Sequence, residues 1–220
     1  MKTAALSQDR LAELIGAFAS RRVAVLGDFF LDKYLDVDPR LADVSVESGK
    51  TAHQVVNVRT SPGAAGTVMG NLAALGAGRL HAIGLTGDDG EGYDLRKCLR
   101  AIGCSTDHLH MSAERHTPQY LKPRDVTDPT LAGEHPRFDT KNRTPTPRDL
   151  ERRIMASIDA LLPELDALLV MDQIEMDECG VVTRAVRELL ADRAPRHPRV
   201  VFWADSRRRI RAYRNVIIKA

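Results

Sequence analysis

The feature that most constrains the fold is a short apolar segment that ends at an aspartate and recurs four times along the chain. The segments run from Arg22 to Leu26 before Gly27-Asp28, from Leu80 to Leu85 before Gly87-Asp88, from Ala167 to Met171 before Asp172, and from Val200 to Ala204 before Asp205. Helical patterns separate them. Strands that alternate with helices favour right-handed βαβ units and a parallel sheet covered by helices on both faces.

Apolar residues at helical spacing predict the helices. The first predicted helix covers residues 8–20, with Ser7 as N-cap and with Leu11, Leu14, Ile15 and Phe18 on its inward side. A second covers 91–102 and ends at Gly103, and another covers 181–190. Between these two, a helix with Thr146 as N-cap and Pro147 at its first position carries Leu150, Ile154, Ile158 and Leu161 on one face. Residues 215–219 predict one more strand.

Two stretches show neither the strand pattern nor the helical pattern clearly. Residues 34–60 mix Val and Thr with polar residues, and 116–145 hold many of the prolines. We expect both to contribute short strands of a small exposed sheet. Between them, residues 62–76 begin as a turn of small residues and continue as a helix that can approach a neighbouring backbone or ligand closely.

Composition bounds the class of protein. With 220 residues, 43% hydrophobic and 28% charged, the chain can bury a core, and we expect one domain over 1–220. The net charge of +2 gives no reason to expect a nucleic-acid partner. The apolar runs are too short to span a bilayer, and early charges argue against a secretory signal. A cytoplasmic protein without a membrane partner is expected.

The three cysteines, Cys98, Cys104 and Cys179, have no CxxC spacing. Neither a disulfide framework nor a zinc site is indicated, and reduced, partly buried thiols are expected. Cys104 lies near His108 and His110, but no fourth ligand follows at a usable spacing.

The carboxyl ends of parallel strands meet at one edge of a sheet, where ligands bind. Asp28, Asp88, Asp172 and Asp205 should therefore line one polar edge suited to hydroxyls or a metal, although each could instead cap a turn or helix. Asp32 follows Asp28 by four residues, and two ionised carboxylates can accept hydrogen bonds from several sugar hydroxyls.

The turn from Gly63 to Gly70 could present backbone N–H groups to a polar ligand, or simply allow close packing. Other nucleotide and catalytic signatures are missing from the sequence: GxxxxGK[ST] does not occur, no GxGxxG follows a strand, and no GxSxG elbow is present. P-loop, ordinary dinucleotide and serine-hydrolase chemistry are therefore disfavoured.

At these residues the chain resembles the PfkB, or ribokinase-like, carbohydrate kinases, and most of all the kinase half of bifunctional ADP-heptose synthases. The resemblance rests on 23–28 with 31–34, on 62–77, and on 84–89, with weaker similarity at 137–139, Asp172, 204–207 and 215–219. It covers about residues 22–220.

The resemblance implies a three-layer αβα sandwich with a mainly parallel sheet and a small β lid, whose strands fit residues 34–60 and 117–124. It also implies phosphoryl transfer from ATP, with Mg²⁺, to a hydroxyl of a sugar or sugar phosphate. The matching positions that would bind the substrate are Asp28, Asp32, Gly63, Ala64, Thr67, Asn71 and Arg137, while Asp172, Asp205 and Arg207 would lie near the phosphate or magnesium.

Three departures from the family pattern stand out. The family usually has Gly-Gly where this chain has Gly63-Ala64, and Asn where it has Thr67. The lysine that often follows the strand ending at Asp172 is not apparent. The Gly-Ala-Gly-Asp signature, which contains the general-base aspartate, would lie beyond residue 220. The resemblance therefore implies that the ATP-binding part is absent, that no catalytic base lies in this chain, and that the chain alone is inactive. The alternative is a non-catalytic sugar-binding or regulatory module.

Two further expectations concern surfaces. The basic segment from Arg207 to Arg214, which includes Tyr213, is expected to be a solvated helix or loop with one arginine near a substrate phosphate, with phosphate contact and stacking on a nucleic acid as the alternative. The edges of the lid sheet could pair with a second subunit, which predicts a homodimer.

Overall fold

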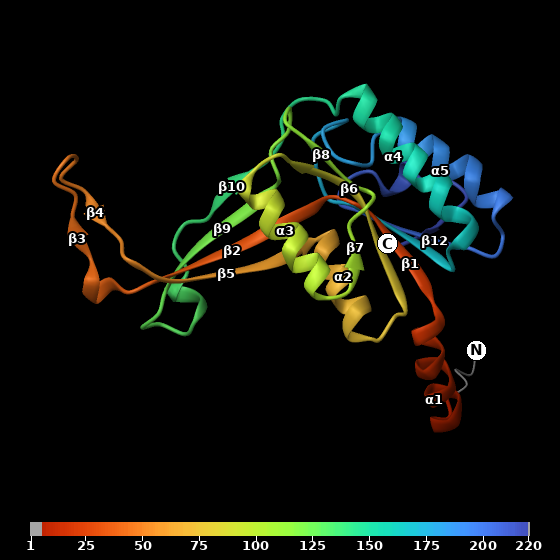
Figure 1. Ribbon diagram of the computed structural model, residues 1–220, viewed down its shortest axis with the longest axis horizontal. Helices are drawn as coiled ribbons and strands as arrows, with labels where there is room; N and C mark the ends of the chain where they lie inside the picture. The colour runs from red at the N-terminus through yellow and green to blue at the C-terminus, as the bar shows by residue number, and fades with distance from the viewer. Residues whose placement is uncertain (1–5, 220) are drawn as a thin grey trace.

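The computed structural model describes residues 6–219, which form a parallel sheet between two helical layers and a second sheet that projects from it (Figure 1). The strands of the main sheet lie in the order β13-β12-β11-β1-β6-β7, and β8 also pairs with β6, always in parallel. Their bounds are β1 Arg22–Gly27, β6 Arg79–Gly87, β7 Cys104–Ser105, β8 Leu109–Ser112, β11 Ala167–Asp172, β12 Val201–Ser206 and β13 Ile217–Ile218. The α/β fold expected from the alternating pattern is confirmed.

The helices cover the two faces of the main sheet in pairs (Figure 1). The helices α2 Ala65–Ala74 and α3 Gly90–Ala101 pack on the face that carries Val23 and Val25. The helices α4 Arg148–Leu161 and α5 Arg184–Arg196 pack on the opposite face, which carries Ala24 and Leu26. Alternate side chains of a strand point to opposite faces, so both sides of β1 are apolar.

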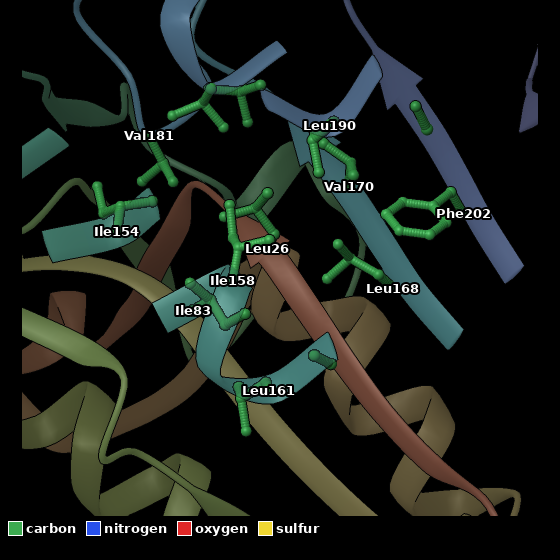
Figure 2. Packing of buried hydrophobic residues seen from close by; sticks show 14 of the residues in the cluster. Leu26, Ile83, Ile154, Ile158, Leu161, Leu168, Val170, Val181, Leu190 and Phe202 are labelled. Atoms are coloured by element: carbon green, nitrogen blue, oxygen red, sulfur yellow. The ribbon is translucent and has the colours of Figure 1, made fainter. Parts of the chain in front are cut away.

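The core on the α4 and α5 side is the larger of the two (Figure 2). Leu26, Ile83 and Val170 come from the sheet, and Ile154 and Ile158 come from one face of α4. All five are at most 1% exposed. Burying such side chains stabilises a fold by roughly 1.5–3 kcal/mol each, so this layer holds α4 firmly against the main sheet.

A four-stranded sheet in the order β10-β9-β2-β5 forms the lid. Its strands are β2 Phe29–Val37, β5 Val55–Ala64, β9 Gln119–Asp125 and β10 Phe138–Thr140, and a hairpin of β3 Asp43–Val44 and β4 Thr51–Ala52 extends from it. The segment β2 is parallel to β9 and antiparallel to β5. The small separate sheet expected from the sequence is thus present, and β2 joins it directly to the end of β1 (Figure 1).

The first helix departs from the expectation for residues 8–20. It is α-helical only over α1 Gln8–Gly16, with a 3₁₀ turn at Ala17–Ser20, and none of its side chains is buried. Leu11 and Ile15, expected to face inward, are 46% and 53% exposed. The reason is position: α1 projects away from both helical layers, so no helix or strand within residues 6–219 covers its apolar side (Figure 1). Residues 1–5, on which the expectation about a secretory signal partly depends, lie outside the described residues.

Two predicted helix starts were wrong. Pro147 has ψ of 140°, so α4 begins at Arg148, and the Thr146 hydroxyl donates to Gly180 O instead of capping the helix. The other helix begins at Arg184 rather than 181, because Val181 is bound elsewhere and Thr183 is the N-cap. It also passes the predicted end and includes Pro195, whose missing N–H would have met Ala191 O; the side-chain amide of Asn215 donates to that carbonyl at 2.9 Å.

Two smaller features complete the fold. Gly103, with φ of 78°, follows α3 as predicted. None of the helices within residues 6–219 is long and apolar enough to cross a lipid bilayer.

Candidate functional site

The inner face of the lid is the side that carries Phe30, Asp32 and Tyr34, at alternate positions of β2. Tyr120 of β9 lies beside Asp32 in the sheet, and its ring centroid is 4.9 Å from that of Phe30. Phe30 in turn packs against Ile174 and Cys179, in the loop that follows β11. We call residues 173–181 the edge loop. The inner face of the lid therefore looks toward the carboxyl edge of the main sheet, where ligands of open α/β sheets bind.

Asp32 is the carboxylate of the inner face that lies beside Tyr120. Its Oδ1 lies 3.1 Å from the Nζ of Lys122, which also donates to the Tyr34 hydroxyl at 3.2 Å. Burial alone would lower the pKa of Lys122, but these two partners outweigh it and raise the pKa. The Asp32 side chain remains 19% exposed, and a carboxylate has about four acceptor positions, so it can accept further hydrogen bonds from a ligand.

Gly63 of β5 is required for this geometry. A Cβ at Gly63 would lie 2.8 Å from Asp32 Oδ2, closer than unbonded atoms can approach. The absence of a side chain lets the β5 backbone pass directly beside the carboxylate. The Gly63–Asp32 contact thus fixes the β5 backbone beside the carboxylate. We call the region between the inner face of the lid and the edge loop, together with the pocket described below, the cleft.

A cationic rim surrounds Tyr120. The guanidinium of Arg137 lies 4.1 Å from the centroid of the Tyr120 ring and forms a two-point ion pair with Asp139, at 2.6 and 3.0 Å. Lys141 Nζ lies 3.3 Å from Asp139 and 5.4 Å from the Tyr120 ring centroid. A cation over an aromatic face is attracted to the ring, which holds these side chains at the mouth of the cleft.

Next to this rim is a pocket of about 220 Å³ between the segment that follows β10 and the edge loop. Its charged side chains are Lys141, Arg143 and Arg207 against a single carboxylate, Glu175. Arg207 Nη1 is 3.9 Å from Glu175, and Arg207 Nε donates to Gln173 at 3.0 Å. The excess of positive charge suits an anionic group.

Asp28 holds the edge loop rather than facing the cleft. The side chain is 3% exposed; Oδ2 accepts from the backbone N–H groups of Gln173 and Ile174, at 2.8 and 2.9 Å, and Oδ1 accepts from Val181 at 2.8 Å. Burial raises the pKa of Asp28 to about 6, although the three amides act in the opposite direction. A Cβ at Gly180 would lie 2.8 Å from Asp28 Oδ1, so the loop also needs a glycine there.

Asp172, at the end of β11, is saturated by neighbours. It is 1% exposed and pairs with Arg209 at 2.6 Å, while the Ser206 and Tyr213 hydroxyls donate to its Oδ2 at 2.7 and 3.3 Å. The hydrogen bonds to Asp172 raise the pKa of Arg209, and burial raises the pKa of Tyr213. These bonds join β11 to the segment after β12 and leave Asp172 little capacity for another ligand.

The sequence of the chain was compared with those of known proteins. No protein-family model matches the chain. It is 29% identical over 180 residues to the bifunctional protein HldE of Desulfatibacillum aliphaticivorans, covering 80% of this chain and 34% of that protein. It is 32% identical over 186 residues to HldE of Nitrobacter winogradskyi, covering 83% of this chain and 36% of that protein. The chain spans about a third of the length of these curated relatives.

Solved structures agree on the fold. Phosphofructokinase-2 of Escherichia coli, in complex with substrates and products, matches 84% of this chain and 54% of its own with a TM-score of 0.54 and 16% identity. Ribokinase of Arabidopsis thaliana, in complex with ribose and ATP, matches 86% and 54%, also with a TM-score of 0.54 and 16% identity. The chain is a homologue of HldE with the fold of the ribokinase-like sugar kinases. The resemblance predicted from the sequence is confirmed.

The structure brings only some of the expected substrate-binding residues to the cleft. Asp32 and Gly63 lie together, and Arg137 stands at the rim. Ala64 packs against the cluster of Phe30, Ile174 and Cys179. Thr67 and Asn71 are exposed on α2, and their side chains make no hydrogen bond or ion pair with the cleft residues named above.

The remaining expected residues, near the carboxyl ends of β6 and β12, have different surroundings. Asp205 pairs with Lys219 at 3.1 Å, Asp88 is exposed, and Arg207 lines the cationic pocket. The expectation of a solvated segment from 207 to 214 was wrong for Arg209 and Tyr213. Both turn inward to Asp172, because a buried carboxylate needs a charged or hydroxyl partner, and Tyr213 at 8% exposed is not available for stacking.

Sequence reasoning missed several residues of the site. Tyr34, Tyr120 and Lys122 flank Asp32, and Lys141 and Arg143 line the cationic pocket. The available signal was the alternation within 119–125, where Tyr120 and Lys122 are two residues apart and so share a face of a strand. Lys141 and Arg143 lie outside any strand and carried no such signal.

Proposed function

We propose that this chain forms the sugar-binding part of an ATP-dependent carbohydrate kinase, which transfers a phosphoryl group from ATP to a hydroxyl of a sugar or sugar phosphate. The observation that carries the proposal is Asp32, a partly exposed carboxylate held by Lys122 beneath the lid and approached by the backbone at Gly63. Carboxylates and aromatic rings together are suited to sugars, which present hydroxyls at their edges and apolar C–H faces.

The cationic pocket supports a substrate that carries a phosphate. Lys141, Arg143 and Arg207 line it, and Arg137 stands at the adjacent rim. Arginine matches phosphate geometry with two parallel hydrogen bonds, and lysine adds a point charge. A sugar phosphate whose hydroxyls reach Asp32 would place its phosphate in this pocket.

ATP enters the proposal through the fold and the relatives, and Mg²⁺ with it. The residues described here do not fit a protein-bound magnesium site: within 6–219 no group of three or more His, Cys, Asp or Glu side chains is placed to hold a metal ion. Asp172, expected near the metal, is occupied by Arg209, Ser206 and Tyr213. We therefore assign this chain the binding and orientation of the sugar, and no step in the transfer itself.

The test is equilibrium binding by calorimetry, with fructose 6-phosphate, fructose, ribose and inorganic phosphate as probes. We expect fructose 6-phosphate to bind more tightly than fructose or phosphate alone. Asp32→Asn should weaken sugar binding by about tenfold or more, the effect of a lost hydrogen bond to a charged group. Asp36→Asn is the matched control, because Asp36 lies on the same face of β2 but pairs with Arg59 at 2.8 Å, farther along the strand.

Two outcomes test the proposal. If none of the four probes binds, the proposed function is wrong. If a sugar binds but ADP release in its presence does not exceed the blank, the chain acts as the sugar-binding part only, or as a non-catalytic module derived from such a kinase.

A homodimer through the lid is the proposed assembly. The outer face of the lid, opposite Asp32, has an apolar groove of about 320 Å³ that includes Leu35, Val37, Val55, Pro123 and Phe138. Phe138 and Val55 are 64% and 44% exposed. Light scattering should give twice the monomer mass, and Phe138→Ser should halve it, while Tyr93→Ser, at an equally exposed aromatic residue on α3, should not. A monomeric wild-type chain would refute the assembly.

A further inference from the structure

Arg115 is a buried arginine on the segment that joins β8 to β9. It is 4% exposed, and its partners are oxygens of two other segments. The Nη1 donates to Thr144 O at 2.8 Å and to the Thr144 hydroxyl at 3.2 Å, and Nη2 donates to Cys179 O at 2.6 Å. The Nε has no partner among residues 6–219. Arg115 thus connects the segment before α4 to the edge loop.

Burying a guanidinium is costly unless its charge and donors are satisfied. The carbonyl groups around Arg115 supply only partial negative charge, and burial lowers the pKa of Arg115. Such an arrangement is not an efficient way to stabilise a fold, since an apolar side chain of similar size would avoid the desolvation. What the guanidinium provides is direction: its planar donors fix the two segments relative to each other.

The edge loop is held from two sides by buried ions. Asp28 accepts from the amides of Gln173, Ile174 and Val181, near both ends of the loop. Arg115 donates to the carbonyl of Cys179, between them. Within the loop held in this way, Ile174 packs against Phe30 of the lid, and Met176 lines the cationic pocket.

We propose that Arg115 is a positioning residue that fixes the edge loop as the wall of the cleft opposite the lid. It does not touch the sugar. By fixing Cys179 and the segment at Thr144, it sets where Ile174 and the cationic pocket stand relative to Asp32. The effect on sugar affinity rests on the function proposed above, whereas the effect on the loop does not.

The experiment is hydrogen exchange of the backbone amides in the 220-residue chain, together with binding of fructose 6-phosphate. Arg115→Met should speed exchange in peptides that cover 173–181 by about tenfold or more, and Arg115→Lys should give an intermediate rate because lysine keeps the charge and some donors. The affinity for fructose 6-phosphate should fall in the same order.

Arg96→Met is the matched control. Arg96 is a half-buried arginine that, like Arg115, donates to backbone carbonyls, those of Thr106 and Leu109, but it lies on α3 and makes no hydrogen bond to the edge loop. Its loss should lower overall stability without selective exchange at 173–181. If Arg115→Met and Arg96→Met change exchange at 173–181 equally, the positioning role is refuted.

The two proposals fail separately. If fructose 6-phosphate does not bind the wild-type chain, the proposed function loses its support and exchange alone decides the role of Arg115. If Arg115→Met does not fold, Arg115→Lys decides it: selective loosening of 173–181 supports the proposal, and uniform loosening overturns it. If the loop loosens while the affinity is unchanged, the edge loop is not a wall of the sugar site.

Discussion

The two walls of the cleft use charged side chains in opposite ways. On the lid, Asp32 and Lys122 are partly exposed, at 19% and 16%, and are within reach of a ligand. On the edge of the main sheet, Asp28 and Asp172 are at most 3% exposed and are bonded to the protein itself. The lid therefore leaves these polar groups accessible, whereas the sheet edge uses its polar groups to stay rigid.

Breaking the ion pair at the sheet edge should have the largest effect. Asp172→Asn leaves Arg209 with only the exposed carboxylate of Asp177 as an anionic partner, and Arg209→Met leaves the buried Asp172 without its cation. Either change should lower the free energy of unfolding by about 3–5 kcal/mol, the usual consequence of removing one partner of a buried pair. Urea unfolding followed by circular dichroism measures it.

Arg207→Met is the control for this prediction. Arg207 is in the same segment, but its side chain is 49% exposed and bonds only to Gln173 and Glu175. Its loss should change the free energy of unfolding by less than about 1 kcal/mol. Equal effects at Arg207 and Arg209 would mean that the edge is not held by the buried pair.

The pH dependence of stability should come next in size. The pKa of Asp28 is raised from 3.8 to about 6, so the folded state holds this proton more tightly than the unfolded state. Stability therefore falls as pH rises from about 4 to about 6, and the difference reaches about 3 kcal/mol at neutral pH. In Asp28→Asn this contribution is missing, so the stability of the wild type minus that of the variant should decrease across that window.

For Asp36→Asn, the stability difference between wild type and variant should change with pH in the opposite direction. Hydrogen bonds from Arg59 lower the pKa of Asp36, so its contribution is present above the unfolded pKa and is lost as pH falls through the folded value. The difference between wild type and this variant should therefore rise with pH at the acid end. A flat difference for Asp28→Asn would contradict the buried, raised-pKa state.

How much of these two walls the sequence could predict depends on how far apart in the sequence the interacting residues are. The strands and core helices were predictable because the apolar period within one segment reports them. Asp32 was predictable as a candidate sugar ligand because it follows Asp28, at the end of a strand, by four residues. The role of Asp28 was not, because its partners Ile174 and Val181 are 146 and 153 residues away. The exposure of α1 was not either, since an amphipathic pattern cannot say whether another element covers it.

On the lid, Lys122→Met should change stability little but binding strongly. The pair with Asp32 is partly exposed, so its loss should lower the free energy of unfolding by about 1 kcal/mol or less. Sugar affinity should fall because Asp32 loses the cation beside it and Tyr34 loses the hydrogen bond from Lys122. Calorimetry and urea unfolding on one preparation separate the two effects. A large loss of stability would place Lys122 with the rigid wall instead.

The smallest predicted effect is a gain in stability at the hinge between the lid and α2. Ala64 has φ of 53° and ψ of −114°, a conformation that only glycine adopts without strain. Ala64→Gly should remove this strain and raise the free energy of unfolding by roughly 1 kcal/mol, after the greater freedom of glycine in the unfolded chain is subtracted. Thermal unfolding should show a higher Tm.

Ala65→Gly tests whether that gain comes from the backbone alone. Ala65 is the next residue, is fully buried and is helical in α2, so glycine there should lower stability by roughly 1 kcal/mol. Opposite signs at adjacent alanines can arise only if the turn at Ala64 is held in its strained form by what surrounds it. The adjacent contacts are Gly63 against Asp32 on one side and the bond from the Ala65 N–H to Asp28 O on the other. The strain at Ala64 is thus a consequence of joining the β5 strand of the lid to the rigid edge of the main sheet within two residues.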